Sequence, residues 1–133
     1  GILYEERGRG IMAEVNEKVV RTADGKKQVV GHFEGVDKIK SAVRMDGWNE
    51  TVVIAKGNNL KQTINGLTTM EITDEEVAKR PDVGVLSLQL HAGPPMIVRF
   101  RTIRVRNLDP DGFEPLFDGA SLTGWKVHDG LPG

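Results

Sequence analysis

The chain has 133 residues, of which 38% are hydrophobic and 28% are charged, a composition typical of a globular protein. Lys and Arg (18 residues) nearly balance Asp and Glu (19 residues), and this excludes a general attraction to nucleic acid or to an anionic membrane. The absence of cysteine excludes disulfide scaffolds, thiolate zinc sites and cysteine nucleophiles. No apolar run is long enough to predict a membrane span.

Short apolar segments separated by glycine and asparagine turns predict an all-β chain folded as an antiparallel sandwich. Three strands are expected at residues 2–4, 11–15 and 28–33. The polar sequence TADGKK at residues 22–27 predicts a turn. Helical spacing of Val36, Ile39 and Val43 then predicts a short helix over residues 37–43.

The middle of the chain carries the strongest local signal, a predicted hairpin. Strands are expected at residues 51–56 and 60–64, and Asn65-Gly66 follows the second of them. Asn-Gly favours a type I′ turn because both of its central residues need a positive φ. This turn predicts that Ile64 pairs with Leu67 and that Gln62 pairs with Thr69.

Beyond the hairpin, the sequence TDEE at residues 73–76 has the form of a capping box. It predicts one or two helical turns through Arg80, ended by Pro81. Alternation of Leu86, Leu88 and Leu90 with polar residues predicts a strand. A last strand begins at residue 96, and a change of phase in its apolar residues predicts a bulge near residues 101–102.

Several spaced motifs resemble one known family. The sequences GILYEERGRG, DGWNETVVIAKGNNLKQTING and LQLHAGPPMIVRFRTIRVRNL are similar to the back half of the 3-keto-disaccharide hydrolase family. The later sequence FEPLFDGASLTGW resembles the opening of the same family. An ending that precedes a beginning predicts three parts. They are the C-terminal part of a jelly-roll domain (1–108), a linker (109–112) and the opening strand of a second copy, or a returning first strand (113–133).

The resemblance implies a concanavalin A-like jelly roll, an antiparallel β-sandwich with one or two short helices. With front strands missing, the sandwich is expected to be incomplete or to be completed by another chain. Members of the family are typically exported bacterial proteins, so the resemblance implies a periplasmic or secreted location. The chain also departs from the family, since Gly57-Asn58-Asn59 stands where relatives often read GNH and no histidine lies near Gln62.

The chemistry that the resemblance implies needs a base. A ketone at C3 acidifies the hydrogen on C2 of the sugar, and a donor must stabilise the resulting enolate oxygen. His91 is the candidate base because histidine exchanges a proton near neutral pH. The alternative is a partly buried histidine that bonds the loop backbone. Glu5 is a second candidate base or metal ligand, and Arg7 is a candidate donor to the enolate.

Four further residues are candidate substrate ligands: Gln89, Trp48, Asn49 and Arg9. Gln89 shares the polar face of its predicted strand with His91. Trp48 could stack on a sugar, although tryptophan at the start of a sandwich strand is more often a core anchor. For the sequence EERGRG, the alternative to a site is a salt-bridged, solvated loop.

Cofactors stay unknown at this point. The family and the scattered Asp, Glu and His residues are compatible with a divalent cation, but no sequence motif supports one. Three functions remain open: a 3-keto-glycoside hydrolase or lyase, a non-catalytic carbohydrate-binding module, and a structural fragment. The expected partner is a carbohydrate. Half a sandwich would also leave open strand edges, which predicts a homo-oligomer or strand exchange.

Overall fold

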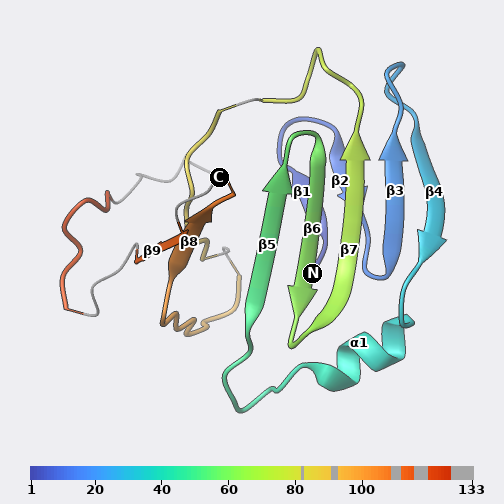
Figure 1. Ribbon diagram of the computed structural model, residues 1–133. Helices are drawn as coiled ribbons and strands as arrows, with labels where there is room; N and C mark the ends of the chain where they lie inside the picture. Colours follow the sequence, from blue (N-terminus) through green and yellow to red (C-terminus); the bar gives the residue numbers. More distant parts are fainter. Residues whose placement is uncertain (82, 91–92, 109–111, 116–119, 127–133) are drawn as a thin grey trace. The chain divides into compact units, whose positions relative to one another are not determined.

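The computed structural model of the chain describes residues 1–81, 83–90, 93–108, 112–115 and 120–126, with only the backbone described for 112–115 (Figure 1). The described residues divide into two compact units, Gly1–Gly84 and Val85–Gly133. The elements in chain order are β1 (Leu3–Glu5), β2 (Gly10–Ala13), β3 (Glu17–Arg21), β4 (Lys27–His32), α1 (Val36–Ala42), β5 (Thr51–Lys56), β6 (Asn59–Ile64), β7 (Leu67–Asp74), β8 (Arg104–Asn107) and β9 (Gly112–Pro115). The expected β-rich class is confirmed.

A five-stranded sheet in the order β4-β3-β7-β6-β5 forms the body of the first unit (Figure 1). Each of its five strands pairs antiparallel with a neighbour in sequence. The pairing of β3 with β7 is parallel, from Glu17 opposite Met70 to Arg21 opposite Asp74. A purely antiparallel sheet was therefore the wrong prediction. The chain between β3 and β7 includes α1 and three strands, which is long enough for the crossover that parallel pairing requires.

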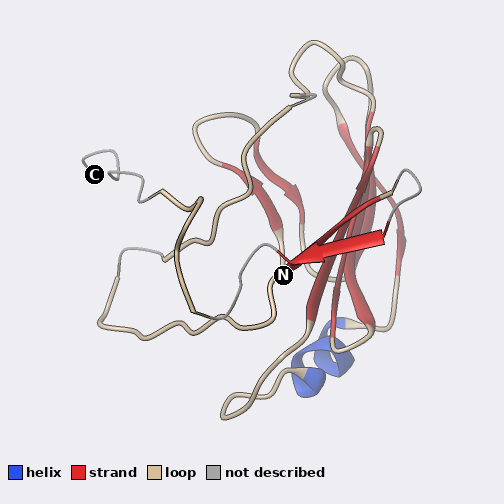
Figure 2. Ribbon diagram, turned by 60° about the vertical axis from the view of Figure 1, so that its left-hand side comes forward, coloured by secondary structure: helices blue, strands red, loops and turns tan. Residues whose placement is uncertain are grey.

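The core of the first unit lies between this sheet and the β1–β2 hairpin. Figure 2 shows the hairpin crossing one side of the sheet. The buried cluster comprises Met12, Ala13, Val19, Met70 and Ile72, with Leu3 and Leu60 packed against it. The hairpin covers the centre of the sheet and leaves its outer strands open, since Val29 on β4 is 44% exposed and Val53 on β5 is 60% exposed.

The predicted helix and hairpin are both present. Helix α1 begins and ends one residue earlier than expected, and it buries Ile39. Asn65 (φ 49°) and Gly66 (φ 82°) both have the positive φ that the turn requires, and Ile64 lies opposite Leu67.

The second predicted pair of the hairpin is wrong. The register shifts between Gln62 and Thr63, so Gln62 lies opposite Met70. At this irregularity the Thr69 hydroxyl lies within hydrogen-bond distance of two oxygens of Gln62, the backbone carbonyl (3.3 Å) and Oε1 (3.0 Å). A bulge therefore replaces the regular ladder after two residue pairs.

The predicted helix after residue 73 is also wrong. Thr73 and Asp74 are the last two residues of β7, paired in parallel with Val20 and Arg21 of β3. Asp74 Oδ1 accepts the backbone N–H of Glu76 at 3.1 Å, which is the local bond expected of a cap. A turn at residues 77–79 follows in place of a helix. Pairing with β3, which the sequence did not predict as a strand, extends β7 through the capping-box sequence.

In the second unit, β8 pairs antiparallel with β9. The strand predicted from the leucine alternation is wrong, because residues 83–90 belong to no sheet. The last predicted strand is shorter than expected and begins at Arg104. Thr102 has a φ of 54°, so the backbone does bend where a bulge was predicted. Residues 109–111 of the predicted linker lie outside the described residues. The predicted third part, residues 113–133, is described only at 113–115 and 120–126.

Candidate functional site

The best-defined polar site in the first unit centres on Arg9. This residue lies in the turn between β1 and β2, and its side chain is only 6% exposed. Its Nε donates to Glu5 Oε2 at 2.6 Å. Nη1 donates to Asp74 Oδ1 at 3.0 Å and to Glu76 Oε2 at 3.3 Å. Nη2 lies 2.9 Å from Asp74 Oδ2, so all three guanidinium nitrogens contact carboxylates.

A second layer of cations surrounds the same carboxylates. Arg21 Nε donates to Glu76 Oε2 at 3.3 Å, and Lys79 Nζ lies 2.9 Å from Glu76 Oε1. Arg80 Nη1 donates to the backbone carbonyl of Asp74 at 2.9 Å. Opposite charges offset each other here, which a buried ionic group requires. The Arg9 cluster, as it is called below, comprises Glu5, Arg9, Arg21, Asp74, Glu76 and Lys79.

Their surroundings favour the charged forms of Arg9 and Glu76. Burial opposes the charge of Arg9, but hydrogen bonds to Asp74, Glu5 and Glu76 outweigh it and raise the pKa of the guanidinium above its ordinary value. The hydrogen bond from Lys79, helped by those from Arg9 and Arg21, lowers the pKa of the Glu76 carboxyl. Arg9, Asp74 and Glu76 therefore form ion pairs where little of each side chain meets solvent.

Glu5 is the carboxylate of the cluster that reaches solvent. Its side chain is 36% exposed, against 7% for Asp74 and 8% for Glu76. The carboxylate lies against Gly8, where an added Cβ would come within 2.3 Å of Glu5 Oε1. A side chain at this position would push the Glu5 carboxylate out of its place. Arg7, in the same turn, is exposed and has a φ of 59°.

The structure places Trp48 at the surface and gives Asn49 a role in holding a loop. Trp48 is 42% exposed, so the alternative of a core anchor is wrong for this residue. Asn49 fastens the loop, since its Oδ1 accepts the N–H of Arg44 and its Nδ2 donates to the Arg44 carbonyl, both at 2.8 Å. Asn65 Nδ2 also donates to Asn49 Oδ1 at 2.8 Å, which ties the loop to the hairpin turn. Sugar binding by Trp48 and Asn49 stays a prediction.

Of the predicted site residues, the structure brings Glu5 and Arg9 into contact and places Arg7 in the turn between them. Gln89 is exposed and belongs to the second unit, and His91 lies outside the described residues. The partners of Arg9 on β7 and just after it, Asp74 and Glu76, were not predicted. The signal was available in the acidic sequence at residues 74–76, which was assigned to a helix start.

The described residues do not fit a divalent cation. Among them, no three His, Asp or Glu side chains form a group that could hold a metal ion. Glu5, Asp74 and Glu76 approach one another, but their oxygens contact Arg9, Arg21 and Lys79. A guanidinium therefore occupies the place among these carboxylates that a cation would take.

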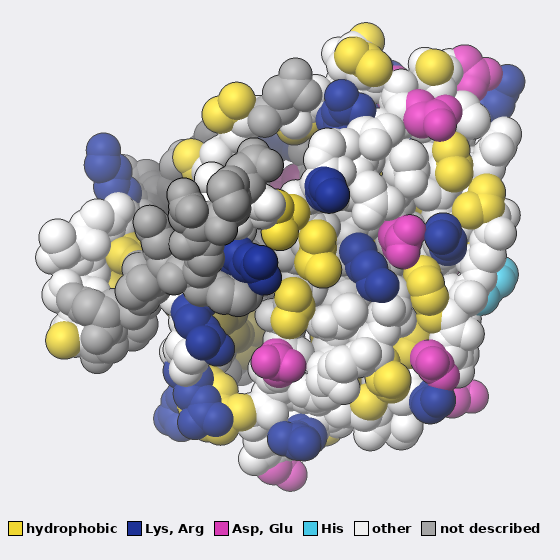
Figure 3. Space-filling model, in the orientation of Figure 1, with side chains coloured by type: hydrophobic (Ala, Val, Ile, Leu, Met, Phe, Trp, Pro, Cys, Tyr) yellow, Lys and Arg dark blue, Asp and Glu magenta, His cyan; other side chains and the backbone are white. Residues whose placement is uncertain are grey.

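The face of the sheet away from the β1–β2 hairpin carries charges of both signs. Figure 3 shows Lys and Arg side chains interspersed with Asp and Glu across this face. One such pair is Lys18 and Glu71, whose side-chain N and O atoms lie 3.4 Å apart. The mixture of signs offers no extended field for a polyanion. Within the described part of the chain, no helix has the length and apolar character needed to cross a membrane.

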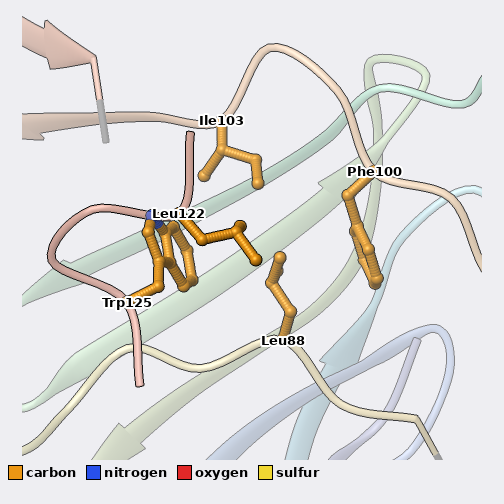
Figure 4. Close-up of a pocket in the computed structure, with 5 residues that line it drawn as sticks. All are labelled: Leu88, Phe100, Ile103, Leu122 and Trp125. Carbon is orange, nitrogen blue, oxygen red and sulfur yellow. The ribbon is translucent and has the colours of Figure 1, made fainter. Parts of the chain in front are cut away.

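The second unit contains an apolar hollow of about 190 Å³ (Figure 4). Its lining residues are Leu88, Phe100, Ile103, Leu122 and Trp125. All five side chains are apolar except for the indole N–H, so the hollow offers little to orient a sugar. Trp125 lies among these side chains.

Comparison with known proteins gives a family. Searches of curated proteins and of solved structures found no match to the chain. A family model described as the 3-keto-alpha-glucoside-1,2-lyase-like domain matches residues 1–106, which include the Arg9 cluster and most of the described strands. The chain therefore belongs to the family of 3-keto-alpha-glucoside-1,2-lyase-like domains.

Proposed function

We propose that the chain serves a carbohydrate-active enzyme that cleaves 3-keto-glycosides by elimination followed by hydration. The observation that carries this proposal is the family match over residues 1–106. The geometry of the first unit supports it, because a half-buried carboxylate, Glu5, meets solvent beside the exposed Arg7. The jelly-roll fold and an extracytoplasmic location are part of the same proposal.

The proposed reaction is an elimination followed by a hydration. A base removes the proton from C2, next to the ketone at C3, and leaves an enolate. The electron pair then forms a double bond between C1 and C2 as the C1–O bond breaks, and the leaving oxygen takes up a proton. Addition of water across the C1–C2 double bond gives the free 3-keto sugar. The protein must supply the base and a positive group for the enolate oxygen.

We assign these roles to the residues of the predicted site. His91 is proposed as the base because its ordinary pKa suits proton exchange near neutral pH. Arg7 is proposed to face the enolate oxygen, since its guanidinium lies at the surface of the turn. Glu5 offers a carboxylate, held by Arg9, that can take or return a proton in the second step.

Turnover of a 3-keto methyl glucoside tests the proposal. In D₂O, proton NMR would follow both the release of methanol and the exchange of the C2 hydrogen. The variants His91→Ala and Glu5→Gln are each expected to lose about 100-fold or more in kcat, the usual contribution of a positioned acid or base. Glu6→Gln, next to Glu5 and exposed, is the matched control and should keep full activity. If the unaltered protein shows no C2 exchange and no methanol release, the proposed enzyme activity is refuted.

A second candidate is a carbohydrate-binding module, favoured by the exposure of Trp48. An exposed indole can stack on the face of a sugar ring. This function predicts saturable binding of the same glucoside, seen as a change in tryptophan fluorescence, without any product. Trp125→Phe should retain the change, while Trp48→Ala should abolish both the binding and the fluorescence response.

The open strand β5 favours a partner that completes the sheet. Val52, Val53 and Ile54 on this edge strand are 41–60% exposed. Such an edge can pair with another chain or with a second copy, which includes strand exchange. Light scattering of the purified chain tests this directly. A mass of about twice 14.6 kDa supports pairing with a second copy, and a cooperatively folded monomer contradicts it.

A further inference from the structure

Arg9 spans two parts of the first unit that are distant in sequence. One edge of its guanidinium binds Glu5, four residues before it in the β1–β2 turn. The opposite edge forms a two-bond contact with Asp74, 65 residues further along the chain. Since a guanidinium is planar and rigid, fixing one edge fixes the direction of the Nε–H on the other.

The partner on β7 belongs to the sheet. Asp74 is the last residue of β7 and pairs with Arg21 of β3, so its backbone is held by the central strands. Glu76 adds a contact to Nη1 and is itself held by Arg21 and Lys79. The orientation of Arg9 is therefore set by the sheet and not by the turn that carries it.

We propose that Arg9 is a positioning residue that holds the Glu5 carboxylate in one orientation toward solvent, with Asp74 as its anchor on the sheet. The catalytic use of Glu5 rests on the proposed function, whereas its orientation by Arg9 does not. Three observations carry it: the 2.6 Å contact to Glu5, the 6% exposure of Arg9 and the 36% exposure of Glu5. A carboxylate this exposed could rotate freely in water, whereas here a buried cation binds one oxygen and Gly8 lies against the other.

A role for Arg9 as a direct substrate ligand fits these contacts less well. All three of its nitrogens already contact carboxylates, and its side chain is buried. A sugar oxygen would have to displace Asp74 or Glu5 to reach it. Arg7, which is exposed in the same turn, is available for that contact without such a loss.

Kinetics of the 3-keto methyl glucoside reaction test the positioning role. Arg9→Lys keeps the charge but cannot bind Glu5 and Asp74 through one rigid plane. We expect kcat to fall by about 100-fold with KM nearly unchanged, the effect of misplacing a group by about 1 Å. Asp74→Asn should act in the same direction. Glu71→Gln is the matched control, because Glu71 lies on β7 and pairs with Lys18 instead. A rise in KM with kcat unchanged would instead make Arg9 a substrate ligand and overturn the proposal.

A second measurement does not depend on activity. The Nε–H of Arg9 gives a proton–nitrogen NMR signal whose exchange with water reports its burial and its acceptor. We expect slow exchange in the unaltered protein, a shifted and faster-exchanging signal in Glu5→Ala, and no change in Glu6→Ala. An unchanged Arg9 signal in Glu5→Ala would overturn the positioning role. Absence of turnover with the expected NMR result would refute the proposed function alone.

Discussion

The coverage of the sheet makes a quantitative prediction through two valines. Val19 on β3 and Val53 on β5 lie on the same face of the same sheet, because the aligned pairs run from Val19 through Ile72 and Leu60 to the strand that carries Val53. Val19 is 1% exposed under the β1–β2 hairpin, and Val53 is 60% exposed. Replacing each by alanine removes the same two methyl groups, so the two variants differ in how deeply those groups are buried and in the place of their strand in the sheet.

The expected costs follow from the burial of each side chain. Two fully buried methyl groups contribute about 1.6 kcal/mol at roughly 0.8 kcal/mol each. Val19→Ala also leaves a cavity, which brings the expected loss in free energy of unfolding to about 2–3 kcal/mol. Only two fifths of the Val53 side chain is shielded, so Val53→Ala should cost about 0.6 kcal/mol and leave no cavity.

Equilibrium unfolding in urea measures both values, with the slope of the transition as the check that the two variants unfold alike. Far-ultraviolet circular dichroism follows the loss of the sheet. Equal losses for Val19→Ala and Val53→Ala would refute the reasoning. They would mean that β5 is covered as fully as β3 in solution.

Two further predictions concern a turn and an ion pair. Neither Gly66 nor Gly84 has a neighbour that an added Cβ would meet, but only Gly66 has a positive φ, of 82°. In a urea titration, Gly66→Ala should therefore lower the free energy of unfolding by about 1–2 kcal/mol, the cost of left-handed backbone, and Gly84→Ala should be nearly neutral. Burial opposes the charge of Glu17, but the hydrogen bond from Lys27 and the N–H of Glu14 lower its pKa. A lowered pKa gives stability that is present at neutral pH and lost as the pH falls below about 4. Glu17→Gln should therefore flatten the acid side of a plot of urea midpoint against pH, and an unchanged slope would contradict this assignment.

Features that depend on neighbouring residues were predictable from the sequence. The Asn65-Gly66 turn needs only two residues with positive φ, and the helix at Val36–Ala42 needs only apolar residues at helical spacing. Both were located to within one residue. The same local reasoning wrongly predicted a helix start at Asp74. An aspartate that accepts the N–H of the residue two positions later occurs both at helix starts and at strand ends.

For the candidate site, only the residues that are close together in sequence were predicted. Glu5 and Arg9 are four residues apart, and the alternative of a salt-bridged, solvated loop already included a contact between them. The ion pair is present, but the Arg9 side chain is only 6% exposed and so is not solvated. Arg9 is buried because Asp74, at the end of β7, and Glu76, just after it, both contact its guanidinium. That meeting depends on the parallel pairing of β3 with β7, and no local pattern in the chain indicates it.

The parallel pairing also sets the order in which we expect the first unit to fold. Strands β3 and β4 form one hairpin, and β5, β6 and β7 form a meander, so each piece can assemble from residues close together in sequence. Joining β3 to β7 closes a long loop, and such distant pairings slow the folding of β proteins. Val19 and Ile72 meet only in that late step. Substitutions in the Asn65-Gly66 turn should therefore leave this joining rate nearly unchanged, while losses at Val19 or Ile72 should slow it.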